Sequence, residues 1–236
     1  MPSRRVAAID CGTNSIRLLI ADVDAATGGL DDVVRRMEIV RLGEGLDRTG
    51  SLSQSALDRT LSAVDDYAGV IRQHDVERVR FIATSATRDA RNRSVFVDAV
   101  RERLGVEPEV ISGDDEAKLS FVGATHELVA AEHPLPYLVV DIGGGSTEFI
   151  MGDPINGISA AMSVDVGCVR MTERHFVNDP PHPAEVSAAR DEALVDGLSE
   201  DIIAPLARQL PTWAPYRHRD SRCVPACLRR TDAVRG

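Results

Sequence analysis

The chain has 236 residues, a formal net charge of −10, 43% apolar residues and 27% charged residues. This length allows one large or two small domains, the composition is ordinary for a soluble globular protein, and the acidic balance argues against a nucleic-acid-binding surface. No apolar run approaches the roughly 20 residues of a membrane span, and Asp10, Gly12 and Asn14 interrupt the N-terminal segment before a signal peptide could form, so we expect a cytoplasmic protein.

The first predicted element is a β-hairpin whose turn carries an acid and a glycine. Its sequence is Ile9-Asp10-Cys11-Gly12-Thr13-Asn14-Ser15, between two apolar runs. Glycine lets backbone N–H groups approach an anion closely, so the turn is predicted to bind phosphate. An ordinary hairpin also favours Gly and Asn, and this alternative stays open for the hairpin taken alone. The predicted phosphate-binding residues are Gly12, Thr13, Asn14 and Ser15.

The elements that follow alternate between strands and helices. Apolar residues recur at helical spacing between residues 57 and 71, and Ser53 is a suitable N-cap. The other predicted elements are, in order, a strand at 32–40, a Gly-rich turn at 41–47, a strand at 79–84, a helix at 96–104 closed by Gly105, and a strand at 109–112.

A cluster of arginines follows the strand predicted at 79–84. Arg88, Arg91 and Arg93 lie in and just after a polar run. Solvated surface is the usual interpretation of such a cluster. Phosphate recognition is the alternative, because a guanidinium group can bind phosphate oxygens bidentately.

Three consecutive acids, Asp114, Asp115 and Glu116, open the next predicted helix. Acids in the first turn stabilise the helix dipole by about 0.3–1 kcal/mol each, which is a sufficient structural reason for them. The functional alternative makes one of the three a general base for water, and their spacing does not choose which. The expected apolar face of this helix comprises Leu119, Phe121, Val122 and Leu128.

The pattern of the first hairpin returns as Val140-Asp141-Ile142-Gly143-Gly144-Gly145-Ser146, with Asp10 and Asp141 offset by 131 residues. Turn geometry alone does not require Asp, Gly and Ser in one register, so the two copies predict two facing lobes around one phosphate-bearing ligand. No Gly-Lys-Ser/Thr follows and the next residues favour a strand, which excludes a Walker A loop and a Rossmann fingerprint. The second set of predicted phosphate-binding residues is Gly143, Gly144, Gly145 and Ser146.

Carboxylates flank the second turn. Asp141 ends the incoming strand and Glu148 lies past the turn, so both are expected to hold a hydrated Mg²⁺ beside the loop. Asp10 is expected to approach the same ion from the other lobe. The alternative for each acid is a solvated side chain.

The alternation of strands and helices predicts an α/β fold. A Pro-containing connector at residues 133–136 places the expected boundary between an N-terminal lobe, 1–134, and a C-terminal lobe, 135–236. Beyond the second hairpin we expect strands to about residue 166, a helix at 169–176 and a long helix at 183–210.

With these residues in place, the chain resembles the exopolyphosphatase and guanosine pentaphosphate phosphohydrolase (Ppx/GppA) family of the actin, Hsp70 and sugar kinase superfamily. The resemblance implies a two-lobed actin-like ATPase fold of the ribonuclease H type, with mixed sheets flanked by helices. The matching segments are, in order, residues 8–15, 41–46, 83–88, 111–117 and 140–148.

The resemblance implies that Glu116 is the catalytic base and that residues 143–146 cradle phosphate. It also implies that Asp141 and Glu148 position Mg²⁺ and that Arg88 contacts the substrate chain. The implied activity is release of terminal phosphate from inorganic polyphosphate. One alternative is hydrolysis of guanosine pentaphosphate to tetraphosphate, which would connect the chain to the stringent response. Another is a nucleotide- or alarmone-binding module, or an inactive truncated remnant, without turnover. Expected partners are these phosphate compounds and a second copy of the chain, with neither nucleic acid nor membrane.

The tail after Trp213 departs from the family pattern. Residues 217–223 are basic and lack an apolar period, and the family's Gly-Thr-x-Thr-Thr segment is not found. One codon set for residues 217–220, read one base later, encodes Gly-Thr-Ala-Thr. We therefore hypothesise a truncated or frameshifted tail and an incomplete second lobe, and a lineage-specific tail is the alternative.

Overall fold

The computed structural model describes residues 3–24, 26–126, 128 and 135–196, together with the backbone of two strands at 213–216 and 226–230. The chain divides into two compact units, Met1–Ser112 and Gly113–Gly236, and each is described by itself. This division assigns the helix at residues 113–125 to the second unit. The boundary expected from sequence, after residue 134, lies outside the described residues.

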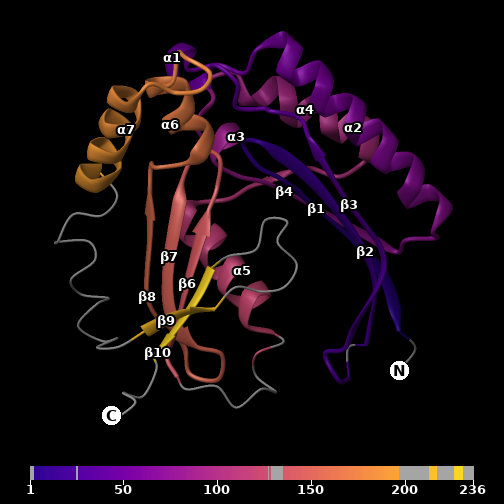
Figure 1. The fold of residues 1–236 in the computed structure, drawn as a ribbon. Helices are drawn as coiled ribbons and strands as arrows, with labels where there is room; N and C mark the ends of the chain where they lie inside the picture. The colour runs from indigo at the N-terminus through magenta and orange to yellow at the C-terminus, as the bar shows by residue number, and fades with distance from the viewer. Residues whose placement is uncertain are drawn as a thin grey trace. The chain divides into compact units, whose positions relative to one another are not determined.

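The first unit contains a five-stranded mixed sheet in the order β3-β2-β1-β4-β5 (Figure 1). The strand β1 pairs antiparallel with β2 and parallel with β4. The predicted strands of this unit are confirmed, with ends displaced by one or two residues. They are β1 (Arg4–Cys11), β2 (Ser15–Val23), β3 (Leu30–Ile39), β4 (Arg78–Ala83) and β5 (Glu109–Val110).

Helix α2 (Gln54–Gln73) is the longest helix of the first unit and confirms the predicted amphipathic segment. The Ser53 hydroxyl accepts a hydrogen bond from the Ala56 N–H at 3.2 Å, so the expected N-cap is present. Helix α4 (Arg93–Leu104) ends at Gly105, whose φ of 69° is favourable for glycine. Two short helices, α1 (Leu46–Thr49) and α3 (Ser85–Asp89), were not predicted from the sequence.

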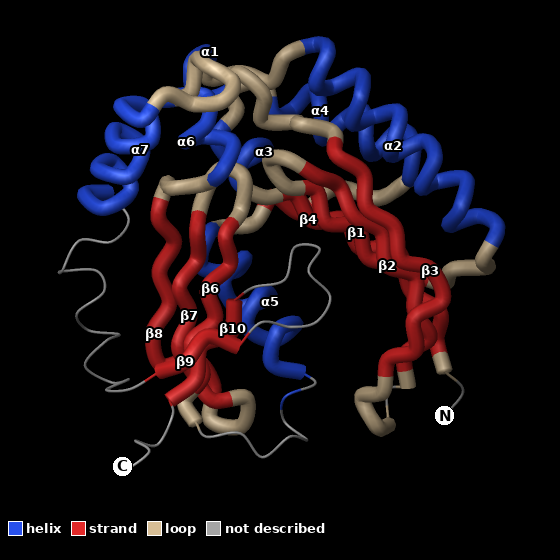
Figure 2. Tube along the Cα trace, in the orientation of Figure 1, coloured by secondary structure: helices blue, strands red, loops and turns tan. Residues whose placement is uncertain are grey.

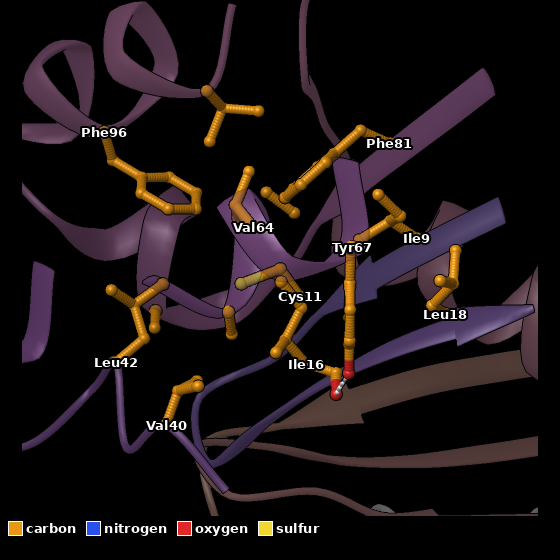
Figure 3. Close-up of a cluster of buried hydrophobic side chains, with 14 of the residues drawn as sticks. Ile9, Cys11, Ile16, Leu18, Val40, Leu42, Val64, Tyr67, Phe81 and Phe96 are labelled. Atoms are coloured by element: carbon orange, nitrogen blue, oxygen red, sulfur yellow. Dashed lines mark hydrogen bonds between the residues drawn. The ribbon is translucent and has the colours of Figure 1, made fainter. Parts of the chain in front are cut away.

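The core of the first unit lies between α2 and one face of the sheet (Figure 3). Ile9, Ile16 and Leu18 from the hairpin and Val64 and Tyr67 from α2 are fully buried. The Tyr67 hydroxyl donates a hydrogen bond to the Ile16 carbonyl oxygen at 3.1 Å. Burial raises the pKa of Tyr67 to about 12. Hairpin and helix are therefore joined by apolar contact and by one buried hydrogen bond.

The second unit contains a five-stranded sheet in the order β8-β7-β6-β10-β9. Its strands are β6 (Tyr137–Ile142), β7 (Thr147–Asp153), β8 (Gly157–Val164), β9 (Trp213–Tyr216) and β10 (Ala226–Arg230). Its helices are α5 (Gly113–Thr125), α6 (Cys168–His175) and α7 (Pro183–Asp196). No element was predicted where β9 and β10 lie. The backbone of β10 pairs with the edge of β6, whose peptide groups would otherwise be unpaired, and β9 pairs with β10.

Both faces of this sheet are covered by apolar side chains. On one face, Val139 and Ile150 pack with Ala117 and Phe121 of α5, which contacts β6, β7 and β8 (Figure 2). On the other face, Leu138, Phe149, Met151 and Val164 form a separate cluster. Because side chains alternate along a strand, neighbouring residues of β6 and of β7 point into two different apolar clusters, one on each face of the sheet.

The two predicted hairpins have the same geometry. Asp10 is the cross-strand partner of Arg17, and Asp141 is the cross-strand partner of Glu148, at the same offset of 131 residues. The Gly12 N–H donates to the Ser15 carbonyl at 3.0 Å, and the Gly143 N–H donates to the Ser146 carbonyl at 2.9 Å. Register shifts also occur at equivalent places, Ile20/Ala21 and Met151/Gly152. The repeat found in the sequence is therefore a structural repeat.

Some predictions for the helices of the second unit were wrong. Phe121 and Leu128 are buried, but Leu119 is 39% exposed and Val122 is 62% exposed, so the apolar face of α5 is narrower than predicted. The helix predicted at 169–176 is confirmed as α6, at Cys168–His175. The long helix begins at Pro183 as expected and is described to Asp196, and its predicted remainder lies outside the described residues. No helix in the described part of the chain has the length and apolarity to cross a membrane.

Candidate active site

Asp141, Glu148 and Ser163 form a row across three neighbouring strands of the second unit. In the antiparallel pairing, Asp141 of β6 lies opposite Glu148 of β7, and Glu148 lies opposite Ser163 of β8. Residues two apart on a strand lie on the same face of the sheet. Asp141 is two residues from Val139 and Glu148 is two residues from Ile150, so both acids lie on the face that α5 covers. The three residues, which we term the acid row, therefore lie on the α5 face at the end of its apolar core.

The two carboxylates of the acid row each accept a hydrogen bond from a serine. The Ser120 hydroxyl of α5 donates to Asp141 Oδ2 at 2.5 Å, and the Ser163 hydroxyl donates to Glu148 Oε1 at 2.7 Å. Glu148 is only 1% exposed, whereas Asp141 is partly exposed. The row therefore runs from a partly accessible acid to a buried one, and both are held by side chains from other elements.

The three acids at the start of α5 differ in their surroundings. Asp114 is exposed, and Asp115 is exposed and forms an ion pair with Lys118 at 3.0 Å. Glu116 is half-buried, and its spacing of four residues from Ser120 places both on one helix face. Ser120 contacts Asp141, and Glu116, one helical turn before Ser120, is the least exposed of the three acids.

The loop at residues 143–146 is hydrogen-bonded to the first turn of α6. The Cys168 N–H donates to the Gly143 carbonyl at 3.0 Å, and the Val169 N–H donates to the Gly144 carbonyl at 2.9 Å. In a trans peptide the C=O and the following N–H point in opposite directions. The N–H groups of Gly144 and Gly145 are therefore directed away from α6, as a cradle for an anion requires.

The first hairpin turn is built in the same way in the first unit. The Gly43 N–H donates to the Thr13 carbonyl at 2.9 Å, and the Val40 N–H donates to the Asn14 carbonyl at 3.0 Å. The same peptide geometry directs the N–H groups of Asn14 and Ser15 away from these partners. The Thr13 and Ser85 hydroxyls share a buried hydrogen bond of 2.7 Å.

The remaining predicted site residues, Asp10 and Arg88, belong to the first unit. Asp10 forms an ion pair with Arg17, with 3.6 Å between Oδ2 and the guanidinium. Arg88 donates to the Ile111 carbonyl at 3.1 Å. Arg91, also in the predicted basic cluster, donates to the Thr49 carbonyl at 2.6 Å. Backbone carbonyls thus orient two of the three clustered arginines, and their contact with substrate stays a prediction.

The acid row matches the ligand preference of Mg²⁺. This ion is usually held by one or two carboxylates and completes its coordination with water and substrate phosphate oxygens. Asp141 and Glu148 supply two carboxylates on adjacent strands, beside a glycine loop suited to phosphate. Within the described residues, no three His, Cys, Asp or Glu side chains gather to form a metal site made of protein alone. The donor set fits a Mg²⁺ that is shared between protein and substrate.

Sequence reasoning identified both acids of the row and missed the serines that contact them. Ser120 was indistinguishable from any polar residue on a helix, and Ser163 from any polar residue on a strand. The detectable signal for Ser120 was its spacing of four residues from Glu116. No comparable signal marked Ser163, because its position opposite Glu148 depends on the register of β8.

Comparison with known proteins identifies one family and several relatives of this chain. The family model described as the Ppx/GppA phosphatase family matches residues 19–214. Exopolyphosphatase 2 of Mycobacterium tuberculosis is 52% identical over 225 residues, which cover 90% of this chain and 67% of that protein. A guanosine-5′-triphosphate,3′-diphosphate pyrophosphatase of Photobacterium profundum is 33% identical over 203 residues, which cover 86% of this chain and 38% of that protein.

A solved structure supports the same relationship. The crystal structure of an exopolyphosphatase-like protein superposes with a TM-score of 0.78 at 46% sequence identity, covering 88% of this chain and 62% of that one. The chain thus spans about two thirds of the length of the first of these curated relatives and of this solved structure.

Proposed function

The chain belongs to the Ppx/GppA phosphatase family, and we propose that it is a Mg²⁺-dependent exopolyphosphatase that releases terminal phosphate from inorganic polyphosphate. The mixed sheet of the first unit, flanked by helices, matches the actin-like ATPase fold that the family shares, whereas every strand pair in the sheet of the second unit is antiparallel. The observation that carries the proposal is the position of α5. Ser120 of α5 donates a hydrogen bond to Asp141, and Glu116 lies one helical turn before Ser120. Asp141 and Glu148 belong to the two strands that the Gly143–Ser146 loop connects. This arrangement supports a role for Glu116 beside the two acids.

In the proposed reaction, Glu116 is the general base. Its carboxylate takes a proton from a water molecule as the water oxygen attacks the terminal phosphorus, and the bridging P–O bond breaks. Orthophosphate and a chain shortened by one phosphate are the products. A partly buried carboxylate on a rigid helix suits this role, because general-base catalysis depends on a fixed distance between base and water.

The phosphate groups are proposed to lie against the glycine loop. The N–H groups of Gly144 and Gly145 would donate to phosphate oxygens, and the rigid loop would bind the charge that develops in the transition state. Asp141 and Glu148 would hold Mg²⁺, which when bound would neutralise part of the phosphate charge. The contributions of Asp10, of the first turn and of Arg88 stay predictions from the sequence.

Hydrolysis of guanosine pentaphosphate is the second candidate, because a relative with a corresponding name is 33% identical. The identity of 52% to an exopolyphosphatase favours polyphosphate. The same catalytic groups would serve both substrates, so only a direct comparison of substrates separates them. Binding without turnover is the third outcome that an experiment must be able to detect.

The test is Mg²⁺-dependent phosphate release by the purified chain, with polyphosphate, guanosine pentaphosphate and ATP assayed in parallel. We expect polyphosphate to be the preferred substrate. Substitution Glu116→Gln should lower the rate by at least about 100-fold, because a positioned general base contributes about 10²–10⁴-fold. Asp114→Asn is the matched control, since Asp114 is an exposed acid two residues away and should leave the rate within about twofold.

Preference for guanosine pentaphosphate would transfer the proposal to the second candidate. Binding of polyphosphate by a folded chain without phosphate release would contradict hydrolysis and favour a binding module. Equal loss of activity in Asp114→Asn and Glu116→Gln would contradict the assignment of the base.

A further inference from the structure

We propose that Ser120 and Ser163 are positioning residues that orient Asp141 and Glu148 and thereby set the affinity of the chain for a divalent cation. The inference rests on the proposed metal-dependent function and adds two residues to that site. Each serine contacts one carboxylate, at 2.5 Å and 2.7 Å respectively. Neither serine is proposed to touch substrate or metal.

The acid row needs such support because its two acids are direct cross-strand neighbours. Residues opposite each other in an antiparallel pair have Cβ atoms about 4.5–5.5 Å apart, and like charges there repel. A hydroxyl donor favours the charged form of a carboxylate and fixes the rotation of its oxygens. A serine hydroxyl occupies only one of the roughly four acceptor positions of a carboxylate, so the serine contact itself is compatible with a bound cation.

The two serines come from different elements, Ser120 from α5 and Ser163 from β8. The packing of α5 against the sheet fixes the distance between them. Gly113, the first residue of α5, approaches Ser163 so closely that a Cβ at position 113 would lie 2.9 Å from the Ser163 Cβ. One helix face carries Gly113, Glu116 and Ser120, at spacings of three and four residues. The helix therefore meets the acid row at both ends, near Ser163 and at Asp141, with Glu116 between them.

The first unit provides an internal comparison. Its row of equivalent cross-strand partners is Asp10, Arg17 and Met37. There the acid faces an arginine, with which it forms an ion pair, and the third position has no hydroxyl. The hairpin and its register are thus built without a serine at this position. The comparison indicates that Ser163 is present because of the acid pair and that the hairpin does not need it to fold.

The test measures Mn²⁺ binding to the purified chain without substrate, by electron paramagnetic resonance of the free ion. Loss of an outer partner of a metal ligand typically lowers metal affinity by about 10–100-fold. We expect such a loss in Ser120→Ala and in Ser163→Ala, and recovery in Ser163→Thr, which restores the hydroxyl on a strand. The matched control is Ser159→Ala. Ser159 also lies on β8, but its hydroxyl donates to the Met151 carbonyl at 3.1 Å.

A second readout separates positioning from folding and from catalysis. In phosphate-release assays the serine variants should need about 10–100-fold more Mg²⁺ for half-maximal rate, while the rate at saturating Mg²⁺ stays close to that of the wild type. Wild-type Mn²⁺ affinity in folded Ser120→Ala and Ser163→Ala would overturn the inference, as would absence of Mn²⁺ binding by the wild type. Weakened Mn²⁺ binding in the variants, with no phosphate release by the wild type, would support the inference and overturn only the proposed activity.

Discussion

Gly167 shows how a single residue without a side chain shapes the proposed phosphate loop. Its φ of −143° is ordinary extended backbone, so glycine is not needed there for conformation. It is needed for space, because a Cβ at this position would overlap the Gly144 carbonyl and lie 2.6 Å from the Gly145 carbonyl carbon. In the first unit, a Cβ at Gly43 would overlap the side-chain methyl group of Thr13. Each turn is thus packed directly against the segment that follows β3 or β8.

Substitution Gly167→Ala should destabilise the chain by about 1–3 kcal/mol, the usual cost of overpacking a close contact, and should lower phosphate release because the loop must shift. Urea denaturation measures the first effect. Gly123→Ala is the control. A Cβ there meets nothing within 4 Å, and Gly123 lies in α5, so alanine should be neutral or stabilising by up to about 1 kcal/mol. Unchanged stability of Gly167→Ala would show that the loop can move without cost.

Elements with a long, regular apolar pattern could be predicted from the sequence. The period of α2 and its cap at Ser53 gave the position of the helix, and β1 and β2 followed from apolar runs around one turn. The five residues of α3 are too few to display a helical period. In α5, Leu119 and Val122 were assigned to the core because they are apolar, but the docking of the helix leaves them exposed and buries Ala117 beside the correctly predicted Phe121.

The candidate site was predictable to the extent that it is local in sequence. Asp141 and Glu148 were found because they flank a turn, and a turn fixes the register of its own strands. Ser120 and Ser163 were missed because their contacts arise from the docking of α5 and from the register of β8. Neither is visible in the residues nearest to the two serines.

Helices α6 and α7 are joined by a cluster of charged side chains. Glu192 of α7 accepts hydrogen bonds from the Arg174 guanidinium at 2.5 Å and from His175 at 2.6 Å. The hydrogen bond from Arg174 holds the pKa of Glu192 below its ordinary value, and His175 adds to this effect. A depressed pKa means that the stabilisation is present above the unfolded-state pKa of about 4.3 and is lost as the pH falls through the folded-state pKa.

The wild type should therefore lose more stability than Glu192→Gln when the pH is lowered from 7 to about 3.5, through the unfolded-state pKa. Urea denaturation at the two pH values measures the difference, which we expect to be at most about 1 kcal/mol for a pair with partial solvent contact. Asp191→Asn is the control, because Asp191 is the exposed neighbour of Glu192 on the same helix. An equal pH dependence in the wild type and in Glu192→Gln would contradict a role for the cluster in holding α7.

At the scale of the whole molecule, one hairpin geometry carries two different charge patterns. The cross-strand partner of Asp10 is Arg17, which gives an ion pair, whereas the cross-strand partner of Asp141 is Glu148. A divalent cation would stabilise the second arrangement by reducing repulsion between the acids. The first hairpin already has an opposite charge in the corresponding position. The two hairpins are thus alike in backbone and different in the charge that lies opposite the acid.

Mg²⁺ should consequently slow amide hydrogen exchange in β6 and β7 more than in β1 and β2. At a concentration of 100 times Kd, a ligand stabilises the state that binds it by about 2.7 kcal/mol. Amides that exchange only when the second unit opens should then exchange about 100-fold more slowly, and Glu148→Gln should reduce this protection because one ligand is lost. Mass spectrometry of peptides from the two hairpins makes the comparison within one sample. Equal protection of β1 and β2 would contradict the asymmetry and would instead support Asp10 as a further ligand, as the sequence predicted.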